Sequence, residues 1–283
     1  MDPSLRTWRR HIGHTAWPTL LLAAATLTVW FSSILAHAMG LLPTPIAAAL
    51  TLVAAYVSFT PLHEATHDNV GAKGQAWLDE VVGWASAIPL LAPYPAFRGI
   101  HLRHHAKTNH PEHDPDMWAS GTGLALAGRC LTIMVHYYQV YLGSLAHSSD
   151  AAAKSRPVAI GYLLAQAGVL ASAAALGFAS TVVWVVIVPG WLATALLALL
   201  FDWLPHHPHT VQGRYIDTRA IPSRVLEVLL LGQNLHLVHH LWPSVPWYRY
   251  GVVFREAEHA LRAKGSPIVD LEDAGLPRLL TRS

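Results

Sequence analysis

The stretch AALTLVAAYVSFTPLHEATHDN, residues 48–69, joins an apolar run to a histidine motif. No charged side chain precedes Glu64 in it, as expected of a helix inside a membrane. The run ends on His63-Glu64-Ala65-Thr66-His67, the H-E-x-x-H string of zinc proteases, whose two histidines share one helical face. The stretch therefore predicts a membrane helix that ends in a metal-binding motif, and the other histidines must decide which kind of metal site it serves.

Charged residues are missing from two long parts of the chain. Of its 283 residues 53% are hydrophobic and 13% charged, yet residues 11–63 and 157–201 contain no Asp, Glu, Lys or Arg. A helix crosses the hydrocarbon core with about 20 residues, so each part accommodates two crossings. The sequence predicts an all-α membrane protein, a single domain over residues 1–283 with a loose tail at about 264–283. Its four transmembrane helices, arranged as two hairpins, are expected at about residues 17–37, 43–62, 158–178 and 181–203.

The basic residues predict the orientation of these hairpins. The turns near residues 38–42 and 179–180 carry no Lys or Arg, so all 19 basic residues fall on the other side of the membrane. The positive-inside rule places that side in the cytoplasm, with both termini and the segments 63–156 and 204–283 as a helical cap. Ala36-His37-Ala38 resembles a signal-peptide cleavage site, but the apolar run before it is longer than a signal sequence needs.

Two further apolar stretches are predicted not to span the membrane. Residues 81–92 are too few to cross and contain Pro89, so they predict a re-entrant or interfacial helix. Residues 121–147 are longer, but Arg129, His136 and several tyrosines suit a helix at the level of the lipid headgroups.

Composition excludes some kinds of partner and site. The net charge is +2 and the basic residues are scattered, so no nucleic-acid partner is expected. The single cysteine, Cys130, rules out an intramolecular disulfide and a cysteine-based zinc cluster.

Histidines are the most unusual feature of the chain. There are 19, and four groups fall on the predicted cytoplasmic side: HxxxH at 63–67, HxxHH at 101–105, PHHPH at 205–209 and HxxHH at 236–240. Spacings of three and four residues bring side chains to one face of a helix. A catalytic zinc uses three protein ligands, so this number of imidazoles predicts two metal ions. Imidazole binds iron, zinc, copper and nickel, so the ligand type does not name the metal.

These boxes and the paired spans resemble the membrane fatty-acid desaturase and hydroxylase superfamily, over roughly residues 45–255. Within it, HLRHHAKTNHPEHDPD (101–116), FDWLPHHPH (201–209) and LGQNLHLVHHLWPSVPWYRY (231–250) look most like the cyanobacterial-type β-carotene hydroxylases. The resemblance implies a di-iron site on the cytoplasmic cap. Carried over by position, its ligands are His63, His67, His101, His104, His105, His206, His236, His239 and His240.

Other residues near the boxes have less certain roles. Acyl-CoA desaturases carry N-x-x-x-H where this chain has Asp202 and His206, so whether Asp202 touches iron or a bound water is open. His110 and His113 are expected to position the second box, and His207 either supports the site or faces solvent. A further set of side chains either touches the metal, orients its ligands or is simply solvated: Asp202, His209, Glu64, Asp68, Asp114, Asp116 and Asn234.

The resemblance also implies the reaction and its partners. Two Fe ions would activate O2, the co-substrate, and an unactivated C–H of a lipophilic substrate from the bilayer would be oxidised to an alcohol or an alkene. No cytochrome b5-like H-P-G-G string is present, so the electron donor is expected to be a separate protein, ferredoxin or similar, with its reductase.

Several functions remain open on the sequence. The first is 3-hydroxylation of the ionone ring of β-carotene toward zeaxanthin, and the second is desaturation or hydroxylation of fatty-acyl lipids, with alkane or sterol oxidation behind. A membrane zinc protease with Glu64 as general base leaves both HxxHH strings unexplained. A metal transporter would bury ionisable residues within its spans, whereas, tyrosines aside, these spans hold only His37 near an outer turn and Asp202 at the end of the last span.

Overall fold

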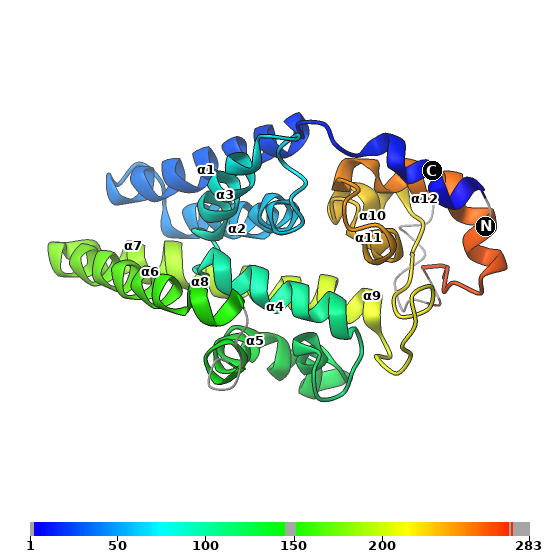
Figure 1. Ribbon diagram of the computed structural model, residues 1–283. Helices are drawn as coiled ribbons and strands as arrows, with labels where there is room; N and C mark the ends of the chain where they lie inside the picture. The colour runs from blue at the N-terminus through cyan, green and yellow to red at the C-terminus, as the bar shows by residue number, and fades with distance from the viewer. Residues whose placement is uncertain (1–2, 145–150, 272, 274–283) are drawn as a thin grey trace.

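The computed structural model describes residues 3–144, 151–271 and 273, and these residues fold into helices (Figure 1). The one strand-like pairing in this part of the chain is an isolated bridge between Ala220 and Ile268. The all-α class predicted from the sequence is therefore confirmed. The longer helices are α1 (Trp17–Ala38), α2 (Thr44–Thr66), α3 (Ala76–Ala87), α4 (Tyr94–Lys107), α5 (Gly123–Ser144), α6 (Ala151–Ala173), α8 (Val188–Leu197) and α12 (Tyr250–Ala263).

Shorter helical segments connect them. The short α-helices are α7 (Ala179–Thr181), α9 (Leu204–His206), α10 (Arg224–Leu229) and α11 (His236–Leu241). Four 3₁₀ segments span Pro3–His11, Pro115–Ala119, Gln233–Leu235 and Trp247–Arg249. Three π-helical segments, Ala174–Phe178, Val182–Ile187 and Ala198–Trp203, lie between α6 and α9.

Three helical stretches of the described chain are long and apolar enough to cross a membrane. They are α1, α2 and the 51-residue stretch Arg156–His206. Prolines stand in the first turn of both α1 and α2, where the missing N–H costs no helical hydrogen bond. Large apolar side chains on the outside of these helices are exposed, including Leu21, Phe31 and Leu164. Such surfaces require a lipid environment, as an integral membrane protein has.

The third stretch differs from the two separate spans expected at about 158–178 and 181–203. Helical segments follow one another from Arg156 to His206, but Gly177 has φ +96°, outside helical geometry. A continuous helix of this length would extend about 76 Å, more than twice the thickness of the hydrocarbon core. The break at Gly177 therefore divides the stretch close to the predicted turn, because only glycine takes this conformation without strain.

The two predicted surface helices are present as α3 and α5, and neither is among the candidate spans of the described chain. Part of the segment expected to be a loose tail packs against the rest of the chain. Backbone hydrogen bonds join Ala220 to Pro267 and Val269, and Leu271 is buried in the core, because its apolar side chain packs against the main cluster. Residue 272 and residues 274–283 lie outside the described part of the chain.

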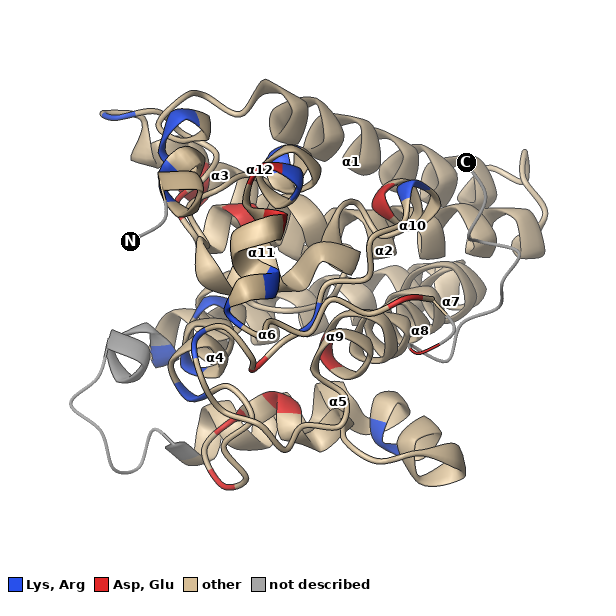
Figure 2. Ribbon diagram, turned by 90° about the vertical axis from the view of Figure 1, so that its right-hand side faces the viewer, with Lys and Arg blue, Asp and Glu red and all other residues tan. Residues whose placement is uncertain are grey.

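Helix α2 holds the centre of the molecule, packing against α1, α3 and α8. At its C-terminal end the ring of His63 contacts His101 on α4 and His239 on α11, two of the elements that carry the other histidine boxes (Figure 1). Charged residues avoid α1 and α8 and gather on the elements around α4, α11 and α12 (Figure 2). The polar end of the bundle is therefore the end at which the histidines meet.

Candidate metal centre

The structure brings all nine expected histidine ligands together, in two groups. Within each group one ring nitrogen of every member lies within 4.8 Å of the others. The five-histidine group comprises His63, His67, His101, His105 and His239. The four-histidine group comprises His104, His206, His236 and His240.

The five-histidine group directs its Nε2 atoms at a common centre. The Nε2 of His239 lies 3.0 Å from that of His63 and 2.8 Å from that of His105. The Nε2 of His101 lies 2.9 Å from that of His67 and 3.0 Å from that of His105. Two ligands at right angles on a metal with bonds of about 2.0–2.1 Å are separated by about 3 Å, so these spacings suit one metal ion.

The four-histidine group is built from three elements. The Nε2 atoms of His104 and His240 lie 3.2 Å apart, and the ring of His206 lies 4.6 to 5.0 Å from those of His104, His236 and His240. His206 is 3% exposed, and neither of its nitrogens has a hydrogen-bond partner among the described residues. A buried ring nitrogen without a partner is unfavourable, and a metal ion would satisfy it.

Helix geometry explains how each HxxHH string is divided. At 3.6 residues per turn, positions i and i+4 point about 40° apart, whereas i+3 points about 100° away from i+4. In α4, His101 and His105 join the five-histidine group and His104 joins the other. In α11 the pair His236 and His240 joins the four-histidine group and His239 crosses to the first. Each HxxHH box therefore contributes to both groups.

Two carboxylates hold His104. Its Nδ1 lies 2.8 Å from Asp114 Oδ1 and 3.2 Å from Asp116 Oδ2, which leaves Nε2 facing the group. Asp114 is itself fixed by the backbone N–H groups of Asn109 and Asp116. This is the arrangement in which a carboxylate orients a metal-bound histidine.

The same carboxylates shift the pKa of His104 in the opposite direction to the pKa values of the neighbouring histidines. Burial lowers the pKa of the other imidazoles outside the spans well below its usual range: His67, His101, His105, His236, His239 and His240. Burial acts on His104 in the same direction, but the charges of Asp116 and Asp114 outweigh it and raise its pKa to about 9. Neutral imidazoles are the form that binds metals, so most of the centre is ready to bind.

Glu64 lies beside the five-histidine group and outside it. Its side chain is fully buried, with Oε1 3.9 Å from His63 Nδ1, and it interacts with the backbone of Trp247 and the side chains of Asn69 and Tyr250. Nearby, the Tyr250 hydroxyl lies 3.0 Å from His239 Nδ1. Burial raises the pKa of Tyr250 well above its usual range, and the charge of Glu64 adds to this effect.

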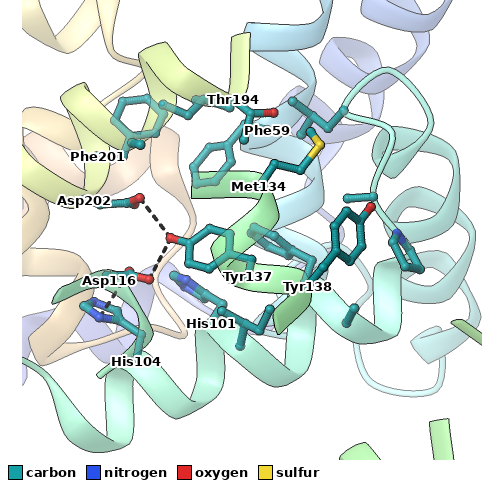
Figure 3. A pocket seen from close by; sticks show the side chains of 18 of the residues that line it. Phe59, His101, His104, Asp116, Met134, Tyr137, Tyr138, Thr194, Phe201 and Asp202 are labelled. Atoms are coloured by element: carbon teal, nitrogen blue, oxygen red, sulfur yellow. Dashed lines mark hydrogen bonds and ion pairs between the residues drawn. The ribbon is translucent and has the colours of Figure 1, made fainter. Parts of the chain in front are cut away.

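Asp202 does not belong to either histidine group. Its Oδ2 accepts a hydrogen bond of 2.9 Å from the Tyr137 hydroxyl, which also lies 2.8 Å from Asp116 Oδ1. Asp202 is thus hydrogen-bonded to a tyrosine on α5, and both side chains line the pocket shown in Figure 3.

The remaining candidates lie outside the two groups as well. Asp68 is exposed and bound by Arg98, and Asn234 donates to the Ile221 carbonyl, a structural contact. His209 is buried, with its ring 6.0 Å from that of His206 and no hydrogen-bond partner among the described residues. His207 packs on Trp203, and the rings of His110 and His113 stack on each other, away from both groups.

Three residues at the site were not predicted from the sequence. Tyr250 contacts His239, Tyr137 joins Asp116 to Asp202, and Gln233 Oε1 lies 3.1 Å from His236 Nδ1. Gln233 stands three residues before His236, a helical spacing that could have suggested the contact. The two tyrosines are remote in sequence from the rings and carboxylates they touch.

A narrow apolar pocket, about 90 Å³ in volume, leads to the histidines (Figure 3). Phe59, Phe97 and Phe201 line its walls, and His101, His104 and His236 lie on its lining. It therefore reaches both histidine groups, since His101 belongs to one and the other two to the second.

Sequence comparison agrees with this site. Residues 39–271 match the fatty acid desaturase family. The chain belongs to that family. This family member is 29% identical over 228 residues to dihydrorhizobitoxine desaturase of Bradyrhizobium elkanii, a match covering 71% of this chain and 64% of the relative's length. It is 23% identical over 264 residues to the sn-1 oleoyl-lipid 12-desaturase of a Picosynechococcus strain. That match covers 82% of this chain and 74% of the relative's length.

Proposed function

We propose that this protein is an O2-dependent di-iron membrane enzyme that oxidises an unactivated C–H of a lipophilic substrate. The observation that carries the proposal is the apolar pocket whose lining includes members of both histidine groups. A substrate carbon in that pocket lies beside the two proposed metal positions. Two iron ions held there by nitrogen ligands would supply the activation of O2.

The side chains around the pocket have separate tasks in this proposal. Phe59, Phe97 and Phe201 enclose a hydrocarbon and exclude water from it. Asp114 and Asp116 fix the ring of His104 so that Nε2 faces the four-histidine group. Tyr250 does the same for His239 in the other group. The nine histidines listed above are the proposed metal ligands; Asp202 and Glu64 are proposed to lie beside them.

Of the two leading substrate classes, the acyl class has more support. Both relatives carry the name desaturase, and one name specifies an oleoyl lipid. The ring of β-carotene is favoured by the likeness of residues 101–116, 201–209 and 231–250 to β-carotene hydroxylases, but neither relative's name mentions a carotenoid. We therefore propose a linear acyl-type chain as the substrate, with desaturation as the first outcome and hydroxylation as the alternative. We also propose that residues 1–283 form a single domain.

The proposed placement in the membrane has four crossings, with the break at Gly177 as the turn of the second hairpin. The distribution of the basic residues supports a cytoplasmic site and cytoplasmic termini. Electrons would then come from a separate cytoplasmic protein, ferredoxin or similar, with its reductase.

We propose the di-iron site in place of the zinc-protease interpretation of H-E-x-x-H. A catalytic zinc site keeps an open position beside three protein ligands, whereas His63 and His67 meet three further histidines. Family membership points the same way.

The test is expression in a bacterium that accumulates β-carotene, with pigments separated by chromatography and lipids analysed by mass spectrometry. New double bonds or hydroxyl groups in acyl lipids, absent with His104→Ala, are the expected result. Hydroxylated pigment with unchanged lipids would overturn the acyl assignment and favour the carotenoid. Purified protein without iron would overturn the proposed function itself.

A further inference from the structure

The substrate pocket has one polar wall. Most of its lining is apolar, but Asp116, Tyr137 and Asp202 lie together at the end beside His104 (Figure 3). Two other polar side chains on the pocket are engaged with the backbone: the Tyr138 hydroxyl donates to Leu91 O at 2.9 Å, and Thr194 donates to Gly190 O at 3.0 Å. Polar capacity toward a ligand is therefore concentrated on that wall.

On this wall the hydrogen-bond acceptors outnumber the donors. Tyr137 has one hydroxyl hydrogen, yet carboxylate oxygens of Asp116 and Asp202 lie 2.8 and 2.9 Å from it. Asp116 has a second partner, because its Oδ2 lies 3.2 Å from His104 Nδ1. Asp202 forms no ion pair with a described residue, although the charge of His104 acts on it, and its one side-chain hydrogen bond among the described residues is the bond from Tyr137 to Oδ2.

A carboxylate in such a place has unused acceptor capacity in apolar surroundings. Leaving a buried acceptor without a donor is unfavourable, and the penalty is larger for a charged group. A ligand that enters the pocket with an O–H or N–H group would remove this penalty. A ligand that is hydrocarbon throughout would increase it by displacing water.

We propose that Asp202 receives a hydrogen-bond donor of the substrate, a hydroxyl or an ammonium group a few bonds from the carbon that is oxidised. The proposal rests on the proposed function. Asp202 precedes His206 by four residues, about 6 Å along the helix, so the donor lies one turn from the four-histidine group. Tyr137 is the positioning residue that turns the carboxylate toward the pocket. The substrate class is thus an amphiphile with an apolar chain and a polar group near the reacting carbon.

The competing role for Asp202 is service to the metal. Asp202 is not part of either group of converging metal-ligand atoms, and its Oδ2 is held by Tyr137. The two roles make different predictions for metal content, which makes them separable by experiment.

The experiment measures equilibrium binding of three probes to the purified iron-loaded protein: tetradecan-1-ol, tetradecylammonium and tetradecyl methyl ether. The first two have a donor and the ether has none. A hydrogen bond to a charged group predicts at least about tenfold tighter binding of a donor probe than of the ether. A preference for the ammonium over the alcohol would assign the donor as cationic, and the reverse would assign a hydroxyl.

Variants connect the preference to this wall. Asp202→Ala and Tyr137→Phe are expected to reduce the donor-to-ether ratio to about one while iron per chain stays at the wild-type value. Asp202→Asn, which keeps the volume, should weaken the ammonium more than the alcohol. Tyr138→Phe removes a hydroxyl already bonded to the backbone, so it should leave the ratio unchanged.

Equal binding of all three probes by the wild type would overturn the proposal, and so would loss of iron in Asp202→Ala, which would assign Asp202 to the metal. Wild-type protein that binds no iron would instead overturn the proposed function, independently of the probe ratio.

Discussion

The two histidine groups differ in ligand number and in the carboxylates beside them. Beside the five-histidine group lies the buried carboxylate of Glu64, 3.9 Å from His63 Nδ1, and the group includes the half-buried His67 and His105. The four-histidine group has Asp114 and Asp116 in contact with His104. We infer that the group with fewer ligands depends more on each of them. It also lies nearer the polar wall of the pocket.

The largest effect is expected for His104→Ala. The change leaves three histidines in the four-histidine group and releases two buried carboxylates from their partner. Turnover should be abolished, and bound iron should fall by about one ion per chain. Metal analysis and product analysis measure both. His113→Ala is the matched control, since that exposed histidine lies outside both groups. Full activity in His104→Ala would contradict the assignment.

Asp114→Asn is expected to have an intermediate effect. The amide keeps the shape of the side chain but weakens the hydrogen bond that orients His104. Loss of such a partner typically lowers metal affinity by about 10 to 100-fold. Titration with a competing chelator measures the affinity of each site. Unchanged affinity would show that Asp114 does not orient His104.

The metal-free protein should lose stability in acid. The six imidazoles whose pKa is lowered stay neutral when folded but take up protons when unfolded below pH 6.5, so stability falls as pH drops below 6.5. His104 acts oppositely: its contribution is complete below 6.5 and is lost as pH rises through about 9. Thermal unfolding after chelator treatment, measured as a function of pH, tests both the acidic and the alkaline loss of stability. Constant stability from pH 7 to 5 would contradict the burial of these rings.

The smallest effect is expected for Glu64→Gln. Glu64 touches neither group of ligand nitrogens, so iron should stay bound and much of the turnover should remain. A zinc protease would lose all activity with this change, because the glutamate is its base. Asp68→Asn, on an exposed pair with Arg98, is the control and should alter stability by at most about 1 kcal/mol.

The sequence predicted what depends on local pattern. Uncharged runs marked α1, α2 and the stretch around Gly177, and histidine spacing predicted which side chains the structure gathers. It could not predict how the boxes divide between two groups, because that depends on the relative rotation of α4 and α11. Nor could it reveal Tyr137 and Tyr250, whose contacts are formed between elements distant in the chain. Burial of Leu271 was missed because glycines and prolines around it resemble those of a loose tail.

The most direct test of two metal positions is elemental analysis of the purified protein combined with X-ray absorption at the metal edge. Two irons per chain in a nitrogen-rich environment, reduced to about one in His206→Ala, are the predicted result. One zinc per chain, unaffected by His206→Ala, would contradict it.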